Sequence, residues 1–416
     1  MMLDSESNIM NHVKNRLNEI KVIKDSEFSY PLSIPTYDEN EILQAIDSMV
    51  THRTTMWEKV AEFERQFGQK YGGEAIMVNS GSSADLIISF ALLNKSGGPL
   101  KPGSKVLIPA VTWPTQIWSV LMAGFRVELV DVDPTTLNMD MKDFRKKINS
   151  DVSAVFLVNL LGNCCDIQEV QDTCRDLKII LLEDCCESLG SKFNSKFFGT
   201  FGLASSFSFF FAHHMVTMEG GMVLTRDSSF AERCRQLRAH GWARSYTKPI
   251  KEMNFRSRYN FVNWGFNVRP TELQGGFGIE QIKKIDYFHD VRIKNAQKLQ
   301  LMIKKYQPFL STMQISDKVE CSWFAFPILI SIESPFTLSE LSDFLENNGV
   351  ETRPIVAGNI AKQPAMSNFP EVEFSNLNGA DFIHENGLYI GIHPKDSSKK
   401  ILRIENLLDL FVEKYK

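Results

Sequence analysis

The chain has 416 residues, of which 43% are hydrophobic and 23% charged, and its formal net charge is −4. This size and composition predict a globular protein of about two domains, and the small negative charge gives no indication that nucleic acid or a membrane is a partner. Residues 1–25 lack the apolar core of a signal peptide, and no segment approaches the roughly 20 apolar residues of a spanning helix. We therefore expect a cytoplasmic protein.

The first predicted elements are helices in an N-terminal extension, residues 1–35, which we expect to pack on the C-terminal domain or on a partner subunit. From about residue 74 to residue 225, apolar runs of strand length alternate with helical stretches. The runs are KVLIPAV, RVELVDVD, AVFLVNLLG, KIILLEDCCES and GGMVLT, and the helical stretches are SADLIISFALL, TQIWSVLMAG and DIQEVQDTCRDL. This alternation predicts an α/β domain with a mostly parallel sheet. Such sheets bind ligands at the carboxyl ends of their strands.

We assign residues 36–295 to this large domain. One long helix, or two in series, is predicted over 270–307. After it the pattern changes, and the segments CSWFAFPILI, LSELSDFLENNGVETRP and SKKILRIENLLDLFVEKY predict a smaller C-terminal α/β domain over 296–416.

The seven cysteines stand as two adjacent doublets and three single residues. They are Cys164, Cys165, Cys174, Cys185, Cys186, Cys234 and Cys321. This spacing matches neither a zinc site nor an iron–sulfur cluster. We expect no metal, and we expect reduced cysteines used as small core residues.

Polar or aromatic residues follow several predicted strands. The serine- and glycine-rich run 80–83 precedes a helix, where small residues and free amides would cradle a phosphate, although the same run also suits an ordinary turn and N-cap. Trp113 could stack on a planar heterocycle or be a core residue. Asp184 ends an apolar run, where a carboxylate needs a partner such as a protonated pyridine nitrogen. With Glu187 it could instead form a capping box.

In this order the segments resemble the DegT/DnrJ/EryC1/StrS family of pyridoxal-phosphate-dependent sugar aminotransferases, which have fold type I. The resemblance runs from YPLSIPTYDENEI to ETRPIVAGN and covers most of the chain. It implies a phosphate site, a stacking aromatic, a carboxylate for the pyridinium nitrogen, a contact to the ring face or hydroxyl, and a phosphate contact across a homodimer interface. These roles fall, respectively, on Gly81, Ser82, Ser83 and Ser208, on Trp113, on Asp184, on Glu187 and on Asn267; His240 and Arg269 are candidates for substrate contacts.

The chain departs from the family at one position. The family's lysine lies six residues before the glutamate of its GEGG motif, and here that position is His213, with Met218 in place of the first glycine. No lysine occurs between Lys196 and Lys248. Pyridoxal or pyridoxamine 5′-phosphate must therefore be held without a covalent link to lysine.

A branch of the family that carries histidine here implies a different reaction, the removal of the C3 hydroxyl from a nucleotide-linked 4-keto-6-deoxy sugar. FFFAHHM, GFNVRPTELQ and ETRPIVAGN most resemble the enzymes of GDP-4-keto-6-deoxy-D-mannose, which make 3,6-dideoxy sugars for O-antigens. A CDP-sugar branch needs an iron–sulfur cluster and is disfavoured, because the chain has no C-x-C pair.

In this interpretation His213 is the general base, for which an ordinary pKa near 6.5 is suitable, and His214 is structural. Glutamate restores the amine form of the cofactor and ammonia is released. Two alternatives are an aminotransferase that has lost its lysine and a non-catalytic cofactor-binding protein. The nucleotide and the sugar configuration rest on the resemblance alone.

Overall fold

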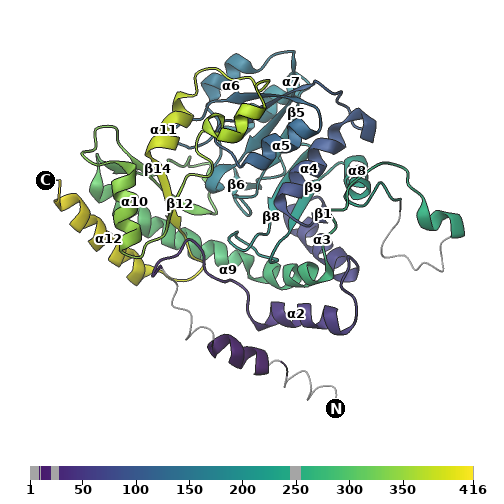
Figure 1. The fold of residues 1–416 in the computed structure, drawn as a ribbon, viewed down its shortest axis with the longest axis horizontal. Helices are drawn as coiled ribbons and strands as arrows, with labels where there is room; N and C mark the ends of the chain where they lie inside the picture. Colours follow the sequence, from purple (N-terminus) through teal and green to yellow (C-terminus); the bar gives the residue numbers. More distant parts are fainter. Residues whose placement is uncertain (1–8, 10, 20–27, 244–253, 416) are drawn as a thin grey trace.

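The structure is a computed structural model that describes residues 9, 11–19, 28–243 and 254–415 (Figure 1). Its centre is a seven-stranded sheet in the order β1-β9-β8-β5-β4-β2-β3. The strands are β1 (Glu74–Val78), β2 (Lys105–Pro109), β3 (Arg126–Val130), β4 (Val152–Val158), β5 (Ile180–Asp184), β8 (Ala204–Ser208) and β9 (Gly221–Thr225). The five strands predicted from apolar runs are all present.

Strand direction brings the chain's polar loops to one edge of this sheet. β9 pairs antiparallel with both β1 and β8, whereas β8, β5, β4, β2 and β3 pair in parallel. β1 therefore runs in the same direction as the parallel strands. The carboxyl ends of six strands and the start of β9 meet at this edge, so the prediction of a mostly parallel sheet is confirmed.

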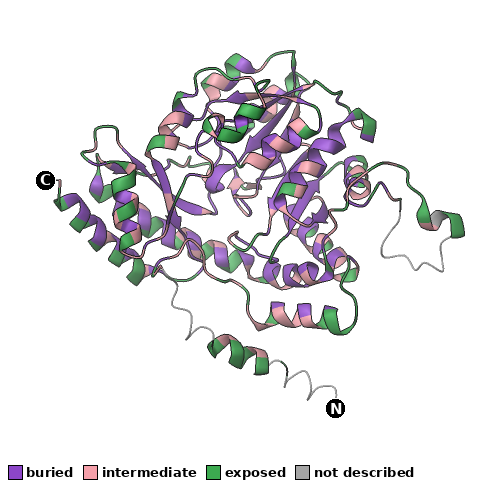
Figure 2. Ribbon diagram, viewed as in Figure 1, coloured by how far each residue is buried: buried purple, intermediate pink, exposed green. Residues whose placement is uncertain are grey.

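Helices cover both faces of the sheet, and its strands are coloured as buried (Figure 2). Along the strands the side chains alternate between two apolar cores. On β1, for example, Ile76 and Val78 enter one core and Ala75 and Met77 the other. The first core also takes side chains from α4, α5 and α8, and the second from α3, α6, α7 and α9. These helices are α3 (Glu58–Tyr71), α4 (Gly81–Leu92), α5 (Pro114–Met122), α6 (Met141–Lys147), α7 (Ile167–Asp176), α8 (Ser228–Arg238) and α9 (Glu272–Ile303).

α9 is one helix of 32 residues, which resolves the prediction of one helix or two in series. Near its start, the carboxylate of Glu272 accepts hydrogen bonds from three amides at the beginning of α3. Near its end, Arg292 donates to the carbonyls of residues 323, 324 and 392, and Asn295 donates to those of 393 and 395. The domain boundary expected at 295/296 falls inside this helix and stays a prediction.

The C-terminal part contains a four-stranded antiparallel sheet in the order β10-β12-β14-β13, with helices packed on it. Its elements are β10 (Leu310–Ser311), β12 (Ala325–Ile330), α10 (Leu338–Asn347), β13 (Thr352–Pro354), α11 (Asn378–Asn386), β14 (Gly387–Gly391) and α12 (Ser398–Glu413). The shorter strands β6 (Lys192–Phe193), β7 (Lys196–Phe197) and β11 (Val319–Glu320) form a third sheet. α2 (Glu39–Val50) lies against α9.

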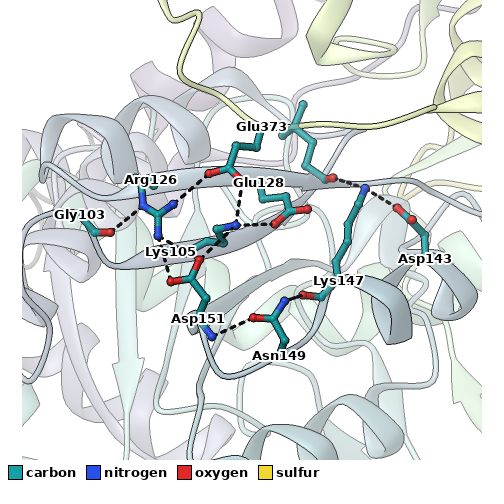
Figure 3. A network of polar contacts seen from close by, with 10 residues as sticks. Gly103, Lys105, Arg126, Glu128, Asp143, Lys147, Asn149, Asp151 and Glu373 are labelled. Atoms are coloured by element: carbon teal, nitrogen blue, oxygen red, sulfur yellow. Dashed lines mark hydrogen bonds and ion pairs between the residues drawn. The ribbon is translucent and has the colours of Figure 1, made fainter.

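An ion network fastens a C-terminal segment to the outer edge of the large sheet (Figure 3). The backbone of Glu373 bonds to Val127 and Leu129, the residues on either side of Glu128 in β3. The ammonium of Lys105 contacts the carboxylates of Glu128 at 3.0 Å and Glu373 at 2.8 Å. The C-terminal part is therefore joined to the large domain at two places, through α9 and at this edge.

All seven cysteines are free thiols, and six of them are buried in the two cores. Their expected role as small core residues is confirmed for these six. The exception, Cys186, is half-buried beside the site described below. Among the described residues no helix is long and apolar enough to cross a membrane.

Candidate active site

The serine- and glycine-rich run after β1 begins α4. The Ser80 hydroxyl accepts a hydrogen bond from the amide of Ser83 at 3.1 Å, which is an N-cap. A Cβ at Gly81 would lie 2.6 Å from Cβ of Ser208 and 3.1 Å from Sγ of Cys186. Only a glycine lets the start of α4 come this close to the end of β8.

This close approach brings three predicted phosphate residues together. Gly81, Ser82 and Ser208 lie at the positive end of α4, where free amides attract an anion. The side chain of Ser82 is exposed there, and the Ser83 hydroxyl instead donates to Asn79 Oδ1 at 2.6 Å. Ser83 can therefore offer a phosphate its amide only after its present bonds change.

Asp184 ends β5 at the same edge and is 6% exposed. Its Oδ1 accepts the amide of Cys186 at 3.0 Å, and no helix follows it, so the capping-box alternative is wrong. Burial raises the pKa of this carboxyl, because the surroundings do not solvate its charge. In the described residues no cation pairs with it, so a cationic ring nitrogen would be a fitting partner.

Glu187 lies three residues further on, and its Oε2 accepts the amide of Leu161 at 3.1 Å. Leu161 has a positive φ of 54°, a conformation uncommon for leucine, which turns its amide toward the carboxylate. Burial raises the pKa of Glu187 to about 7, the Leu161 bond opposes this shift, and the charge of Asp184 adds to it. Glu187 can therefore gain or lose a proton near neutral pH.

The loop after β8 carries the two histidines. Its ends are closed by backbone bonds from Phe209 to Gly220 and from Thr217 to Phe209, each 2.9 Å. His213 is half-buried, whereas His214 is 1% exposed and its Nε2 donates to the Ser322 carbonyl at 3.3 Å. His213 is therefore the more accessible of the two rings, and the roles assigned to His213 and His214 from the sequence stay predictions.

The Nδ1 atom of His213 has no hydrogen-bond partner in the described structure. Its ring meets Phe324 edge to face, with the centroids 5.0 Å apart. Burial lowers the pKa of His213 to about 3, and the guanidinium of Arg292 contributes. The imidazole is thus neutral at physiological pH, and it binds a proton more weakly than an imidazole with the ordinary pKa used in the sequence argument.

The remaining predicted residues lie on the surface. Trp113 precedes α5 at the same sheet edge and is 58% exposed, so it is not a core tryptophan. Asn267 is exposed, its backbone pairs with Ala239, and its Oδ1 accepts from Arg269 at 2.9 Å. His240, next to Ala239, is also exposed. The structure thus places Asn267, Arg269 and His240 together, and the neighbouring Val268 carbonyl accepts the amide of Asn79 at 3.0 Å, just before the serine- and glycine-rich run.

Several residues near the site were not identified from the sequence. Gln274 donates to the Glu219 carbonyl at 2.6 Å, and Gln281 accepts the amide of Val216 at 3.2 Å, so α9 holds the histidine loop at two points. Tyr389 of β14 lies near Glu187. Burial raises the pKa of the Tyr389 hydroxyl, and the charge of Glu187 raises it further. The signal available in the sequence for these helix contacts was the two glutamines of the glycine-rich segment TELQGGFGIEQ.

The arrangement fits pyridoxal or pyridoxamine 5′-phosphate. It offers an anion site at the start of α4, a buried carboxylate without a cation, an exposed aromatic side chain at the same edge, and an imidazole nitrogen without a partner. No residue in the loop can form a covalent link with an aldehyde as lysine does. Such a site can hold the ring, keep its nitrogen protonated and move a proton through His213.

Comparison with known proteins gives consistent matches. A model described as the DegT/DnrJ/EryC1/StrS aminotransferase family matches residues 35–408. GDP-4-keto-6-deoxy-D-mannose 3-dehydratase of Escherichia coli O55:H7 is 38% identical over 374 residues, 88% of this chain and 95% of that protein. Its counterpart in Yersinia pseudotuberculosis is 36% identical over 393 residues, 91% of this chain and 98% of that protein.

A solved structure gives the same result in three dimensions. GDP-4-keto-6-deoxymannose-3-dehydratase with a trapped PLP-glutamate geminal diamine has a TM-score of 0.85 and 35% sequence identity. The match covers 91% of this chain and 100% of that one. The similarity therefore extends over both the large sheet and the C-terminal part.

Proposed function

The chain belongs to the DegT/DnrJ/EryC1/StrS aminotransferase family, and from that premise we propose that it is a PLP-dependent nucleotide-sugar 3-dehydratase. Its substrate is a 4-keto-6-deoxy sugar linked to a nucleotide, GDP-4-keto-6-deoxy-D-mannose, and its product is the 3,6-dideoxy ketosugar. The observation that carries this proposal is His213, a histidine in the lysine position with a free Nδ1. The 36–38% identity to named 3-dehydratases supports it.

The cofactor, when bound, supplies an amine that joins the C4 ketone and a protonated ring that withdraws electrons. Gly81, Ser82 and Ser208 bind its phosphate, and Trp113 stacks on its ring. Asp184 keeps the ring nitrogen protonated, because a buried carboxylate is stabilised by an adjacent cation. These are residues predicted from the sequence, and all of them lie at the carboxyl edge of the large sheet.

His213 moves the proton. Its neutral imidazole takes a proton from the C4′ carbon of the cofactor, and the resulting imidazolium gives a proton to the departing C3 hydroxyl, which leaves as water. In the empty site the pKa of His213 is about 3. The phosphate and the carboxylates of a filled site bring negative charge, so we expect the pKa to rise when the cofactor and substrate bind.

A histidine in this position separates dehydration from amination. A lysine there would compete for the cofactor aldehyde and could return a proton to the sugar, which favours transfer of the amine. His213 cannot form a covalent link with the cofactor aldehyde, and it returns a proton to the sugar only weakly. Glutamate then restores the amine form of the cofactor, and the nitrogen of each cycle leaves as ammonia.

The test is a product assay. The purified protein is incubated with PLP, L-glutamate and a panel of GDP- and CDP-linked 4-keto-6-deoxy sugars, and the product mass and ammonia are measured. Dehydration gives a 3-deoxy ketosugar and ammonia, whereas an aminotransferase leaves nitrogen on the sugar. His213→Asn should keep cofactor binding and lose turnover; His52→Asn, at an exposed histidine after α2, should keep both. Turnover in His213→Asn would refute the assignment of the base.

We also infer a homodimer in which Asn267 reaches the phosphate site of a second copy. Support comes from its exposure and from the exposed apolar side chains near it in sequence, Phe261, Val262 and Trp264. Light scattering should give twice the chain mass. Asn267→Ala should weaken PLP binding while the dimer persists, and unchanged PLP binding would contradict the role of Asn267.

A further inference from the structure

A buried acid, Asp85, has no role in the reaction as proposed. It lies on α4 one turn after Gly81 and is 2% exposed, and its Oδ1 has no hydrogen-bond partner in the described structure. α4 packs against β8. On β8, Ser206 is the residue paired with Asp184 of β5. Asp85 therefore lies over the part of the sheet that holds Asp184.

The hydroxyl of Ser206 lies between these two acids. It is near enough to lower the pKa of both carboxyl groups, although burial raises each of them more. Its Oγ is fully buried and forms no well-directed hydrogen bond to either acid. A hydroxyl has one proton to donate, so Asp85 and Asp184 compete for the same donor.

The elements packed around α4 bring no cation to this pair. α5, β8 and β9 carry no ionisable side chain. On α8, Arg235 pairs with Glu74 of β1 and Arg238 with Glu64 of α3. The other charged groups of these elements act elsewhere: Glu232 contacts Arg235, Arg233 lies over Phe230, and Lys95 is exposed.

The titratable groups that face Asp184 from its own loop are Cys186 and Glu187. Neither is cationic. Two buried carboxyl groups that share a donor and lack a cation cannot both be ionised without a large cost, so the pair keeps a proton. Burial first, and then the charge of Asp184, raise the pKa of Asp85 well above its ordinary value. Asp85 is thus the member that stays neutral when Asp184 is ionised.

We propose that Asp85 is a positioning residue that holds a proton beside Asp184 and, through the Ser206 hydroxyl, orients the Asp184 carboxylate toward the cofactor's ring nitrogen. In the resulting chain, Asp85 donates to Ser206 and Ser206 donates to Asp184. The role toward the cofactor rests on the proposed function. The shared proton belongs to the protein alone and can be measured without substrate.

The first test measures thermal unfolding of the cofactor-free protein between pH 5 and pH 8. A raised pKa in the folded state contributes stability at low pH that is lost as the pH rises, and Asp85→Asn removes this dependence. The melting temperature of Asp85→Asn should therefore gain on that of the wild type as the pH rises, by about 2 °C or more. A difference that stays constant with pH would overturn the proposal.

The matched control is Asp131→Asn. Asp131 is also buried, but its carboxylate accepts hydrogen bonds from the amides of Val132, Gly379 and Ala380. Its replacement should lower the melting temperature at every pH. The difference from the wild type should thus change with pH for Asp85→Asn and stay nearly constant for Asp131→Asn.

The second test measures the dissociation constant of PLP at pH 7.5 by absorbance titration. Asp85→Asn keeps a donor and should bind within about threefold of the wild type, whereas Asp85→Leu and Ser206→Ala break the chain and should bind about tenfold more weakly. If Asp85→Leu binds PLP like the wild type while remaining folded, the proposal is wrong. These results are independent of dehydratase turnover, so the failure of one proposal does not imply the failure of the other.

Discussion

The close contact between Gly81 and Ser208 yields a quantitative prediction for Gly81→Ala. The added Cβ would lie 2.6 Å from Cβ of Ser208, about 0.8 Å short of the ordinary 3.4 Å contact. The backbone of α4 or β8 must shift to relieve this overlap, because Cβ of Ser208 has no rotamer. Overpacking of this kind costs about 1–3 kcal/mol. The helix propensity of alanine returns at most about 1 kcal/mol.

We therefore expect Gly81→Ala to lower the free energy of unfolding of the cofactor-free protein by about 1–2 kcal/mol. A shift of the phosphate site should also weaken PLP binding at least tenfold, about 1.4 kcal/mol. Chemical denaturation gives the first quantity, and titration of the cofactor gives the second.

A second substitution tests the cause. Ser208→Gly deletes the atom that the new methyl group would strike and leaves Sγ of Cys186, at 3.1 Å, as the nearest atom. Gly81→Ala should then cost at least about 1 kcal/mol less in the Ser208→Gly background than in the wild type. If Gly81→Ala costs the same in both backgrounds, close approach is not the reason for the glycine, and the reasoning is refuted.

Three further predictions follow from other contacts. His213→Lys restores the family's residue, so PLP followed by borohydride should add a pyridoxyl mass at position 213, whereas the wild type should gain none in residues 197–247; an adduct there in the wild type would contradict non-covalent binding. Burial lowers the pKa of His289 to about 3, so this ring contributes stability above its ordinary pKa that is lost as the pH falls, and His289→Gln should unfold at lower pH than the wild type in an acid titration monitored by circular dichroism; earlier unfolding of the variant would count against this. In the edge network, Glu373→Gln should lower the free energy of unfolding by less than about 1 kcal/mol, because Glu373 is 42% exposed. Lys105→Met leaves Glu128 unpaired and should lower it by about 1–2 kcal/mol, measured by chemical denaturation. Equal costs would show that Lys105 is not the centre of the network.

The sequence predicted those parts of the fold that depend on local pattern. The β-branched runs that became β2 to β5 and β9 are apolar and short, and each is bounded by polar or glycine residues. β8 was not predicted, because its sequence ASSFS is rich in serine. Its hydroxyls are accommodated inside: Ser205, for example, donates to the Gly199 carbonyl at 2.9 Å. That compensation is a tertiary contact and leaves no mark in the local sequence.

The same distinction holds for the site. Asp184 and Trp113 were identified because strand ends in parallel sheets face the ligand, and His213 because it stands where a family resemblance requires lysine. Asp85 and Arg292 were missed, since each lies within a helix and a charged residue there is usually solvated. Arg292 is 3% exposed and is held by backbone carbonyls from distant segments. Only the packing of the C-terminal part onto α9 makes it a buried cation behind the histidines.

The polar side chains along α9 fix the number of residues between its contact positions. Glu272 holds the start of α3, Gln281 holds the histidine loop, and Arg292 holds the chain just before β12 and just after β14. An inserted residue between any two of these would turn the remainder of the helix by about 100° and advance it by about 1.5 Å. The downstream contacts would then be lost together. Homologous chains should therefore vary freely in loop length yet keep the number of residues between these positions. The length of α9 thus fixes how far apart α3, the histidine loop and the C-terminal part lie along the helix.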